Sequence, residues 1–357
     1  RQRQMCIRDS YLTTNLNGSV TVLTGSLAGI QQFTIPVTGP YRIVAAGSPA
    51  GPGVGLVTYS NGCRGRIVQG DVFLTAGTVL KILVGQRGST AYTSTGGGGG
   101  SYVATISNSC LIVGGGGGGY CSLLSSPTPS SDANYTSNGN DYTGSGGGGT
   151  GGSNGAGGNG GSQWGGGGGG FTGNGTAGTA CGGTGGTSFI NGGLGAGTCY
   201  SSWGGFGGGG GTHGNTGGGG GGGGYSGGGG SGQTPSNSAG GGGGSFISPN
   251  FTAPTDLGFN VNDGYVLITR LCNITLNSSS PNGLGALCAG QSVTLSTNAV
   301  SGISWSTGGT GTSVVVSPGV TTTYSVTGTS TANCVTSAAI QLTVNNSVPN
   351  LTVTSTG

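Results

Sequence analysis

The side chains that enzymes most often use for acid–base, nucleophilic or metal chemistry are scarce in this sequence. It holds one histidine, His213, one lysine, Lys81, and six acidic residues, none of which is a glutamate. His213 lies in the connector GTHGNTG, whereas Asp71 and Asp263 lie in GD and NDG contexts, where an aspartate commonly bonds nearby backbone amides in a turn. We therefore expect no catalytic residue, no metal site and no cofactor, and we predict that the chain is not an enzyme.

The pattern G-x-G-x-x-G, which can bind a dinucleotide, recurs along the chain. With 93 glycines among 357 residues, chance alone yields about six matches, and a real site needs a match that opens a helix directly after a strand. No match has that context, and Lys81 lies in an apolar run typical of a strand. The pattern therefore reflects glycine content.

Charge is also sparse, which bears on the class of partner. Charged residues make up 4% of the chain, the formal net charge is +3, and no lysine or arginine lies between Arg87 and Arg270. Proteins that bind nucleic acid through glycine-rich segments need basic side chains to contact the phosphates. We expect no nucleic-acid partner.

The nine cysteines are the remaining reactive side chains. With Cys6 set aside, eight remain, and none stands in a C-x-x-C pair, so disulfides of an exported protein are favoured over a zinc site, with buried reduced thiols as the alternative. Closeness in sequence and the domain pattern below predict four pairs: Cys110–Cys121, Cys181–Cys199, Cys288–Cys334 and, by elimination, Cys63–Cys272.

Apolar residues cluster at residues 20–113 and 259–345, whereas glycine dominates 96–244. The stretch 30–45 predicts a hairpin-like pair of half-buried strands, and 66–88 predicts two strands broken at Gly70–Asp71 and Ala76–Gly77. Further strand patterns occupy 101–115 and 263–272, and no long segment has helical periodicity. We predict an all-β frame, a jelly-roll-like antiparallel sandwich over residues 20–272, with a glycine insert at about 96–244.

The glycine insert needs its own source of stability. Ordering a residue costs about 1–2 kcal/mol of backbone entropy, and glycine buries no side chain to offset that cost. Extended glycine chains without Cβ atoms can pack side by side and form backbone hydrogen bonds in several directions. We therefore predict a bundle of polyglycine II helices. Five aromatic residues flank the tracts and would seal this bundle: Trp164, Phe171, Trp203, Phe206 and Tyr225.

The segment WGGFGGGGG through GGSFISP, residues 203–249, resembles the extracellular glycine-rich region of the anaplastic lymphoma kinase and leukocyte tyrosine kinase receptors. Upstream, LAGIQQFTIPVTGPYRIVAAGSPAGPG and LKILVGQRG are similar to the tumour-necrosis-factor-like module of that family, and DGYVLITRLC is similar to its closing strand. The likeness covers about residues 27–272. It implies a β-sandwich with inserted polyglycine helices that serves extracellular ligand recognition. No growth-factor-like module, membrane span or kinase follows in this sequence, so kinase activity is not implied.

Residues 288–346 predict a second domain. Five short strands separated by turns, with Trp305 between Cys288 and Cys334, are typical of a small immunoglobulin-like sandwich and resemble the Ig-like repeats of Bacteroidota surface proteins. We expect a linker at 273–287 and the start of a further repeat at 347–357. The opening decapeptide RQRQMCIRDS looks like a translated sequencing adapter, so residues 1–10 are expected to be a non-native leader.

These observations predict a non-enzymatic recognition or adhesion module, extracellular or at a cell surface, and part of a larger secreted protein. Its partner would be an unidentified protein or glycan on another surface. The alternatives are a structural matrix or cell-envelope protein, a phage-type tail adhesin, and a receptor ectodomain. No stretch reaches the about 18 apolar residues of a membrane span.

Overall fold

The computed structural model describes residues 20–52, 63–91, 94–120, 129–144, 146–179, 183–197, 202–212, 218–232, 238–272, 274–279, 287–330 and 334–345. The chain divides into two compact units, Arg1–Thr269 (unit 1) and Arg270–Gly357 (unit 2). Both are built from strands and turns, with only single-turn 3-10 helices at Gly25–Leu27, Pro129–Ser131 and Phe189–Asn191 in the described part.

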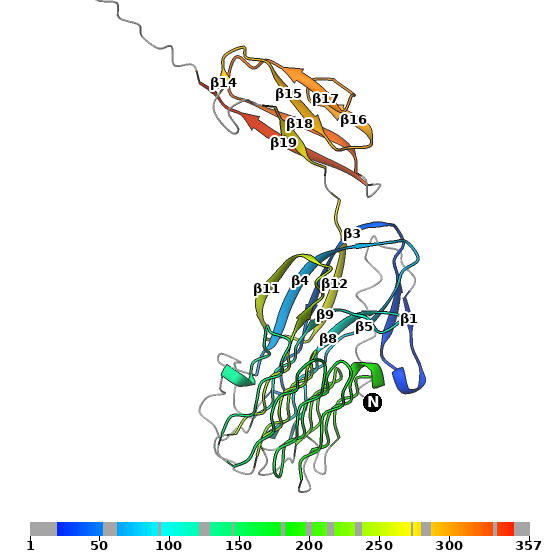
Figure 1. The fold of residues 1–357 in the computed structure, drawn as a ribbon, viewed down its shortest axis with the longest axis vertical. Helices are drawn as coiled ribbons and strands as arrows, with labels where there is room; N and C mark the ends of the chain where they lie inside the picture. Colours follow the sequence, from blue (N-terminus) through cyan, green and yellow to red (C-terminus); the bar gives the residue numbers. More distant parts are fainter. Residues whose placement is uncertain are drawn as a thin grey trace, which may run out of the picture. The chain divides into compact units, whose positions relative to one another are not determined.

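Unit 1 is framed by two antiparallel sheets (Figure 1). Sheet A has the strand order β1 (Val20–Val22), β2 (Gln31–Thr34), β5 (Val79–Leu83), β8 (Ser101–Thr105), β9 (Cys110–Gly114), β10 (Phe246–Ile247). Sheet B has the order β11 (Thr252–Asn260), β4 (Gly65–Leu74), β3 (Gly39–Ala46), β12 (Tyr265–Arg270). The short strands β6 (Thr90–Ala91) and β7 (Ser94–Thr95) pair separately.

Alternating apolar residues of both sheets build one core. In β3, Tyr41 and Ile43 point inward and are fully buried, and they meet Leu80 of β5 and Val103 of β8 in one hydrophobic cluster. This period of two is the burial pattern of a sheet packed on one face. The predicted all-β fold and the β-sandwich are therefore confirmed.

Two local predictions for this frame are wrong. The stretch 30–45 does form two strands, but β2 belongs to sheet A and β3 to sheet B, so they are not a hairpin. Strand β4 runs unbroken through Gly70 and Asp71. Gly70 lies under the ring of Phe251, where a Cβ would come within 2.6 Å of Cδ1, so this glycine provides room for an aromatic ring and does not end the strand.

The glycine insert continues the strands of the frame beyond one end of the sandwich. The tract 96–100 runs directly into β8, the tract 115–119 leaves β9, and the tract 240–244 leads to β10. Figure 1 shows these segments as long traces that lie side by side. The turn 75–78, between β4 and β5, lies at the other end of the frame.

Unit 2 is a small sandwich of two three-stranded antiparallel sheets. One sheet has the order β13 (Leu276–Ser278), β15 (Val293–Thr297), β17 (Ser313–Val316), and the other has β16 (Ser301–Trp305), β18 (Thr322–Thr329), β19 (Val335–Leu342). A parallel pair joins β14 (Leu287–Cys288) to β20 (Val344–Asn345).

Trp305, Val316 and Leu342 lie in one buried cluster of unit 2, whereas Val315 is exposed. The expected linker 273–287 is corrected by the structure: it contains β13, which pairs with β15, and the buried core residue Ile274. The sandwich therefore begins well before residue 288. The short polar strand was missed because it shows no clear alternation.

Candidate functional site

The tract 218–224 lies at the centre of the glycine insert and is buried throughout. Its backbone amides donate outward in a repeating order to three neighbouring segments. Gly220 and Gly223 donate to residues 95–98, Gly221 and Gly224 to residues 166–169, and Gly222 to Gly241. Every third residue thus faces the same neighbour.

The same repeat of three appears in other tracts. In the tract 165–170, donors three apart reach the segments 228–231, 208–211 and 173–176 in turn. In the tract 96–100, Gly97 and Gly100 both donate to the segment 207–210. A strand repeats every two residues and an α-helix every 3.6, whereas a polyproline II-type helix has three residues per turn. The period fits the predicted polyglycine II packing, which stays a prediction.

The packing of the tracts leaves no space for side chains. A Cβ on Gly220 would lie 2.0 Å from the carbonyl oxygen of Gly210, and one on Gly222 would lie 2.1 Å from that of Gly116. Both distances are far below van der Waals contact, and the neighbouring atoms are backbone, which cannot move aside without breaking hydrogen bonds. Glycine is therefore required at these positions by the approach of the chains.

An aromatic row seals the bundle against sheet A. The ring centroids of Tyr102 and Phe189 lie 5.2 Å apart, those of Phe189 and Phe171 5.1 Å, those of Phe171 and Tyr225 6.1 Å, and those of Tyr225 and Phe246 4.3 Å. Such offset stacks add about 0.5–1.5 kcal/mol each beyond the burial of the rings. The aromatic row thus supplies apolar burial that the glycines cannot provide.

Of the five aromatic residues predicted to seal the bundle, three belong to this layer and the two tryptophans do not. Phe171 and Phe206 are buried in the cluster of the aromatic row, and Tyr225 packs against it. Trp203 is 45% exposed and Trp164 is half-buried. Phe189 also belongs to this layer, but it follows the connector GGTS within the insert and no sequence pattern marks it.

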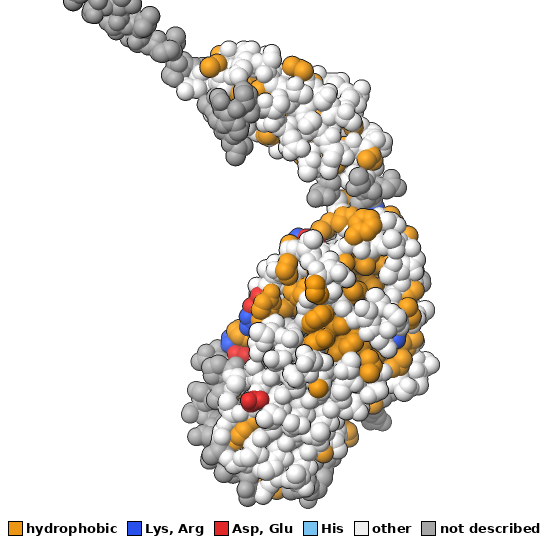
Figure 2. All heavy atoms as spheres, in the orientation of Figure 1, with side chains coloured by type: hydrophobic (Ala, Val, Ile, Leu, Met, Phe, Trp, Pro, Cys, Tyr) orange, Lys and Arg blue, Asp and Glu red, His pale blue; other side chains and the backbone are white. Residues whose placement is uncertain are grey.

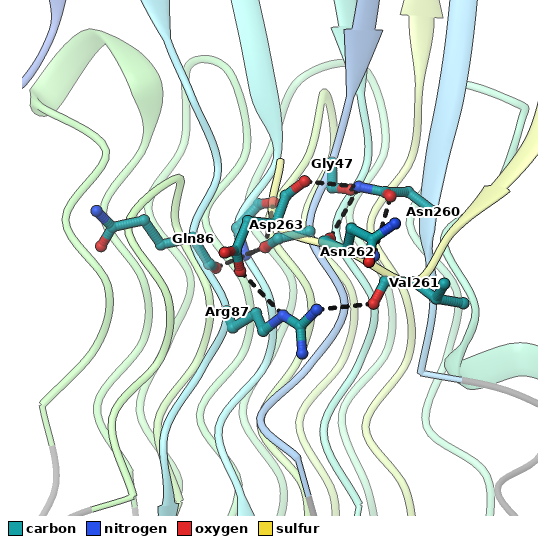
Figure 3. Close-up of polar contacts among 9 residues, drawn as sticks. Gly47, Gln86, Arg87, Asn260, Val261, Asn262 and Asp263 are labelled. Carbon is teal, nitrogen blue, oxygen red and sulfur yellow. Dashed lines mark hydrogen bonds and ion pairs between the residues drawn. The ribbon is translucent and has the colours of Figure 1, made fainter. Parts of the chain in front are cut away.

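A polar junction fixes the loop between β11 and β12 to the segments that follow β3 and β5 (Figure 3). Asn260 is 3% exposed, and its Nδ2 lies 2.8 Å from the carbonyl oxygen of Gly47 and 2.9 Å from that of Asn262. Its Oδ1 accepts a hydrogen bond from the backbone amide of Asn262. This buried amide therefore has partners for both its donor and its acceptor.

Arg87 closes the same junction from the other side. Its guanidinium donates to the carbonyl oxygen of Val261 at 2.8 Å, and its Nε lies 2.9 Å from a carboxylate oxygen of Asp263. Asp263 is therefore in the connection that its NDG context predicted, where it pairs with an arginine. Asp263 thus pairs with Arg87 in the connection between β11 and β12.

Two arginines, Arg64 just before β4 and Arg66 within it, form ion pairs at the edge of the glycine insert. Arg64 forms a bidentate pair with the buried carboxylate of Asp132, with one N–O distance of 2.7 Å, and this bond raises the pKa of Arg64. Arg66 pairs with Asp256. Both guanidinium groups lie over the ring of Phe259, at 3.9 and 4.4 Å from its centroid. Asp132 comes from the insert, so the Arg64–Asp132 pair anchors the insert next to β4, whereas Arg66–Asp256 links β4 to β11 within sheet B.

The cysteines depart from the predicted pairing. Cys272 bonds to Cys334, with the two Cα atoms 5.9 Å apart, which is within the usual span of a disulfide. The predicted pairs Cys288–Cys334 and Cys63–Cys272 are therefore wrong. Cys288 is instead an exposed free thiol on β14. Cys63 is a buried free thiol of unit 1.

Cys63 and Cys110 are free thiols inside unit 1. Cys63 is fully buried beside Ser131, and burial raises its pKa to about 12. Cys110 opens β9 and packs against the aromatic row, and burial raises its pKa also. The predicted bond from Cys110 to Cys121 is therefore corrected; Cys121 and the predicted pair Cys181–Cys199 lie outside the described residues.

The other chemistry-bearing residues have structural partners. Lys81 lies on β5, as expected, and its Nζ donates to the side chain of Asn108 at 2.8 Å. Asp71 pairs with Arg42 across the strands β3 and β4. His213 lies outside the described residues. Within the described ranges, no group of three or more histidine, cysteine or acidic side chains converges to hold a metal ion.

No protein-family model matches this chain. In the part of the chain that the structure describes, none of the helices has the length and apolar character that crossing a membrane requires.

Proposed function

We propose that this chain is a non-enzymatic recognition or adhesion module, extracellular or at a cell surface, in which a polyglycine II bundle holds binding loops. The observation that carries the proposal is the lattice of backbone hydrogen bonds around 218–224. Each bond contributes about 0.5–1.5 kcal/mol net, so many tracts must pack together to offset the entropy of ordering glycine. A chain that maintains such a costly lattice gains a rigid support whose connectors are free to vary.

The connectors at the far end of the bundle are the proposed contact surface. Because the tract 96–100 enters β8 at residue 101, residue 96 marks the end of the bundle that lies away from the sheets. Backbone hydrogen bonds show which residues of the other tracts lie at the same end. Gly220 bonds to Thr95, and Ser231 bonds to both Gly219 and Gly165. The connectors 161–164 and 176–179 therefore belong to that far end.

The surface of this region favours an uncharged partner. In Figure 2 the glycine-rich end of unit 1 is almost entirely backbone and small polar groups, whereas hydrophobic side chains gather over the strand-rich part. Such a surface offers hydrogen bonds from hydroxyl and backbone groups without electrostatic steering. A glycan or a polar protein surface fits that chemistry.

The test compares one substitution at the two ends of unit 1. Labelled full-length chain is titrated onto a printed glycan panel and onto intact cells, as wild type, Ala177→Arg and Ala76→Arg. Ala177 is exposed in a far-end connector, and Ala76 is exposed in the turn 75–78 at the opposite end. We expect saturable binding that Ala177→Arg weakens at least tenfold and Ala76→Arg leaves unchanged. Absence of saturable binding on both supports would favour a structural matrix protein.

A further inference from the structure

The disulfide of unit 2 joins two points that decide how a pull on the chain would be transmitted. Cys272 comes two residues after Arg270, the last residue of β12, and Cys334 immediately precedes β19. The two cysteines are 62 residues apart in sequence. Residues 273–333 thus form a covalently closed loop beside the main path of the chain.

From this connectivity we infer that unit 2 is a load-bearing spacer that hardly extends under tension. A pull that arrives through β12 reaches Cys272, crosses the disulfide to Cys334 and leaves through β19 and β20. The strands β13 to β18 carry none of it. This inference rests on the proposed adhesive function, because adhesion is what would place the chain under tension.

The segment that carries the load is already extended. Strand β19 pairs with β18 at eight consecutive positions, from Val335 to Leu342, and β20 follows after a single residue. Strand residues rise about 3.3 Å each, close to the greatest length that a chain can reach. A force does work only over a gain in length, so tension along β19 does little to favour unfolding.

The core of unit 2 lies almost wholly in the protected loop. Of the nine buried residues in its cluster, only Leu342 lies on the loaded segment. Trp305, Leu295 and Val326 all belong to strands inside the closed loop. Without the disulfide, the pull would enter before β13 and leave at β20, and it would act on the first and last strands of the whole sandwich.

Single-molecule force spectroscopy on the full chain, held through handles at its two ends, tests this load path without a ligand. We compare the oxidised wild type with the double variant Cys272→Ser/Cys334→Ser and with Cys288→Ser, which removes the exposed free thiol of the same unit. The double variant should show an additional unfolding step of about 210 Å, because the two cysteines are separated by 62 residue steps of about 3.3–3.6 Å each. Wild type and Cys288→Ser should lack this step.

Reductant added to a folded wild-type molecule should produce the same additional step, which covers the case in which the double variant does not fold. A 210 Å step in oxidised wild type, or no added step after reduction, would overturn the inference. Because no partner is present in this measurement, its failure is distinct from failure of the recognition proposal.

Discussion

At the scale of single residues, the glycine insert is defined by positions where a Cβ has no room. Gly220 and Gly197 are matched for a test because both lie in the insert and both have ordinary backbone angles for an L residue. A Cβ on Gly220 would meet backbone at 2.0 Å, whereas one on Gly197 would make an ordinary 3.4 Å contact with the Trp203 ring.

We expect Gly220→Ala to lower the free energy of unfolding by at least about 2 kcal/mol, because overpacking and lost hydrogen bonds add together. Gly220→Val should cost more. Gly197→Ala should stay within about 0.5 kcal/mol of wild type, as surface substitutions usually do. Thermal melts of the three variants measure this, and equal melting points for Gly220→Ala and Gly197→Ala would refute the close packing.

The free thiols Cys63 and Cys288 differ in exposure and therefore in reactivity. Alkylation of the native, oxidised protein should modify Cys288, which is exposed, and spare Cys63, whose burial raises its pKa to about 12 and suppresses the reactive thiolate. Cys272 and Cys334 should appear in one linked peptide. Mass spectrometric peptide mapping checks both statements. Alkylation of Cys63 as fast as Cys288, or a Cys288–Cys334 linked peptide, would contradict the structure.

At the scale of elements, the strand β13 moves the start of unit 2 from residue 288 back to residue 270. A fragment 288–346 would lack Ile274, the pairing of β13 with β15, and the partner of Cys334. Loss of a disulfide that closes a loop of this length costs about 4 kcal/mol in the chain-entropy model, and loss of a buried isoleucine costs about 2–5 kcal/mol more.

We therefore expect a fragment 270–346 to melt cooperatively when oxidised, and a fragment 288–346 to remain largely unfolded at 25 °C. Circular dichroism melts of both fragments, with reduced 270–346 as the control for the disulfide, make the comparison. A cooperative melt of 288–346 that equals that of 270–346 would show that β13 does not belong to the folded unit.

The positions of the strands were easier to predict from the sequence than the pairing of the strands within the sheets. Alternation in 30–45 and the β-branched run near Lys81 predicted strands where β2, β3 and β5 lie, because the burial period of a strand is visible locally. Alternation carries no information on which sheet receives a strand, so β2 and β3 were wrongly paired. Gly70 was misread because the ring above it, Phe251, comes from a distant part of the chain.

The general nature of the candidate site, packed glycine tracts with an aromatic seal, was predictable from the sequence. Its individual contacts were not, because they join segments far apart in the chain. Glycine content predicted packed tracts, and the aromatic residues beside them predicted a seal, which Phe171 and Phe206 provide. The anchoring of Asp132 by Arg64 and the burial of Asn260 depend on contacts between segments far apart in sequence. No local pattern marks such contacts, and cysteine spacing likewise did not identify Cys272–Cys334.

At the level of the whole molecule, the sandwich and the glycine tracts of unit 1 contribute different stabilising interactions. The sandwich core and the aromatic row provide apolar burial, and the glycine tracts provide hydrogen bonds but almost no apolar surface. Because the tracts continue the strands, neither the frame nor the bundle is a separate body. We expect the two to unfold in one transition.

Amide hydrogen exchange across 218–224 in the full-length protein distinguishes a packed glycine bundle from a flexible linker. Five consecutive amides of this tract, Gly220 to Gly224, donate to segments from distant parts of the chain. To expose them, the surrounding tracts must separate, so we predict exchange as slow as that of the core strand β4. If these amides exchange as fast as an unstructured glycine peptide while β4 stays protected, the glycines are a flexible spacer and do not form a rigid recognition scaffold.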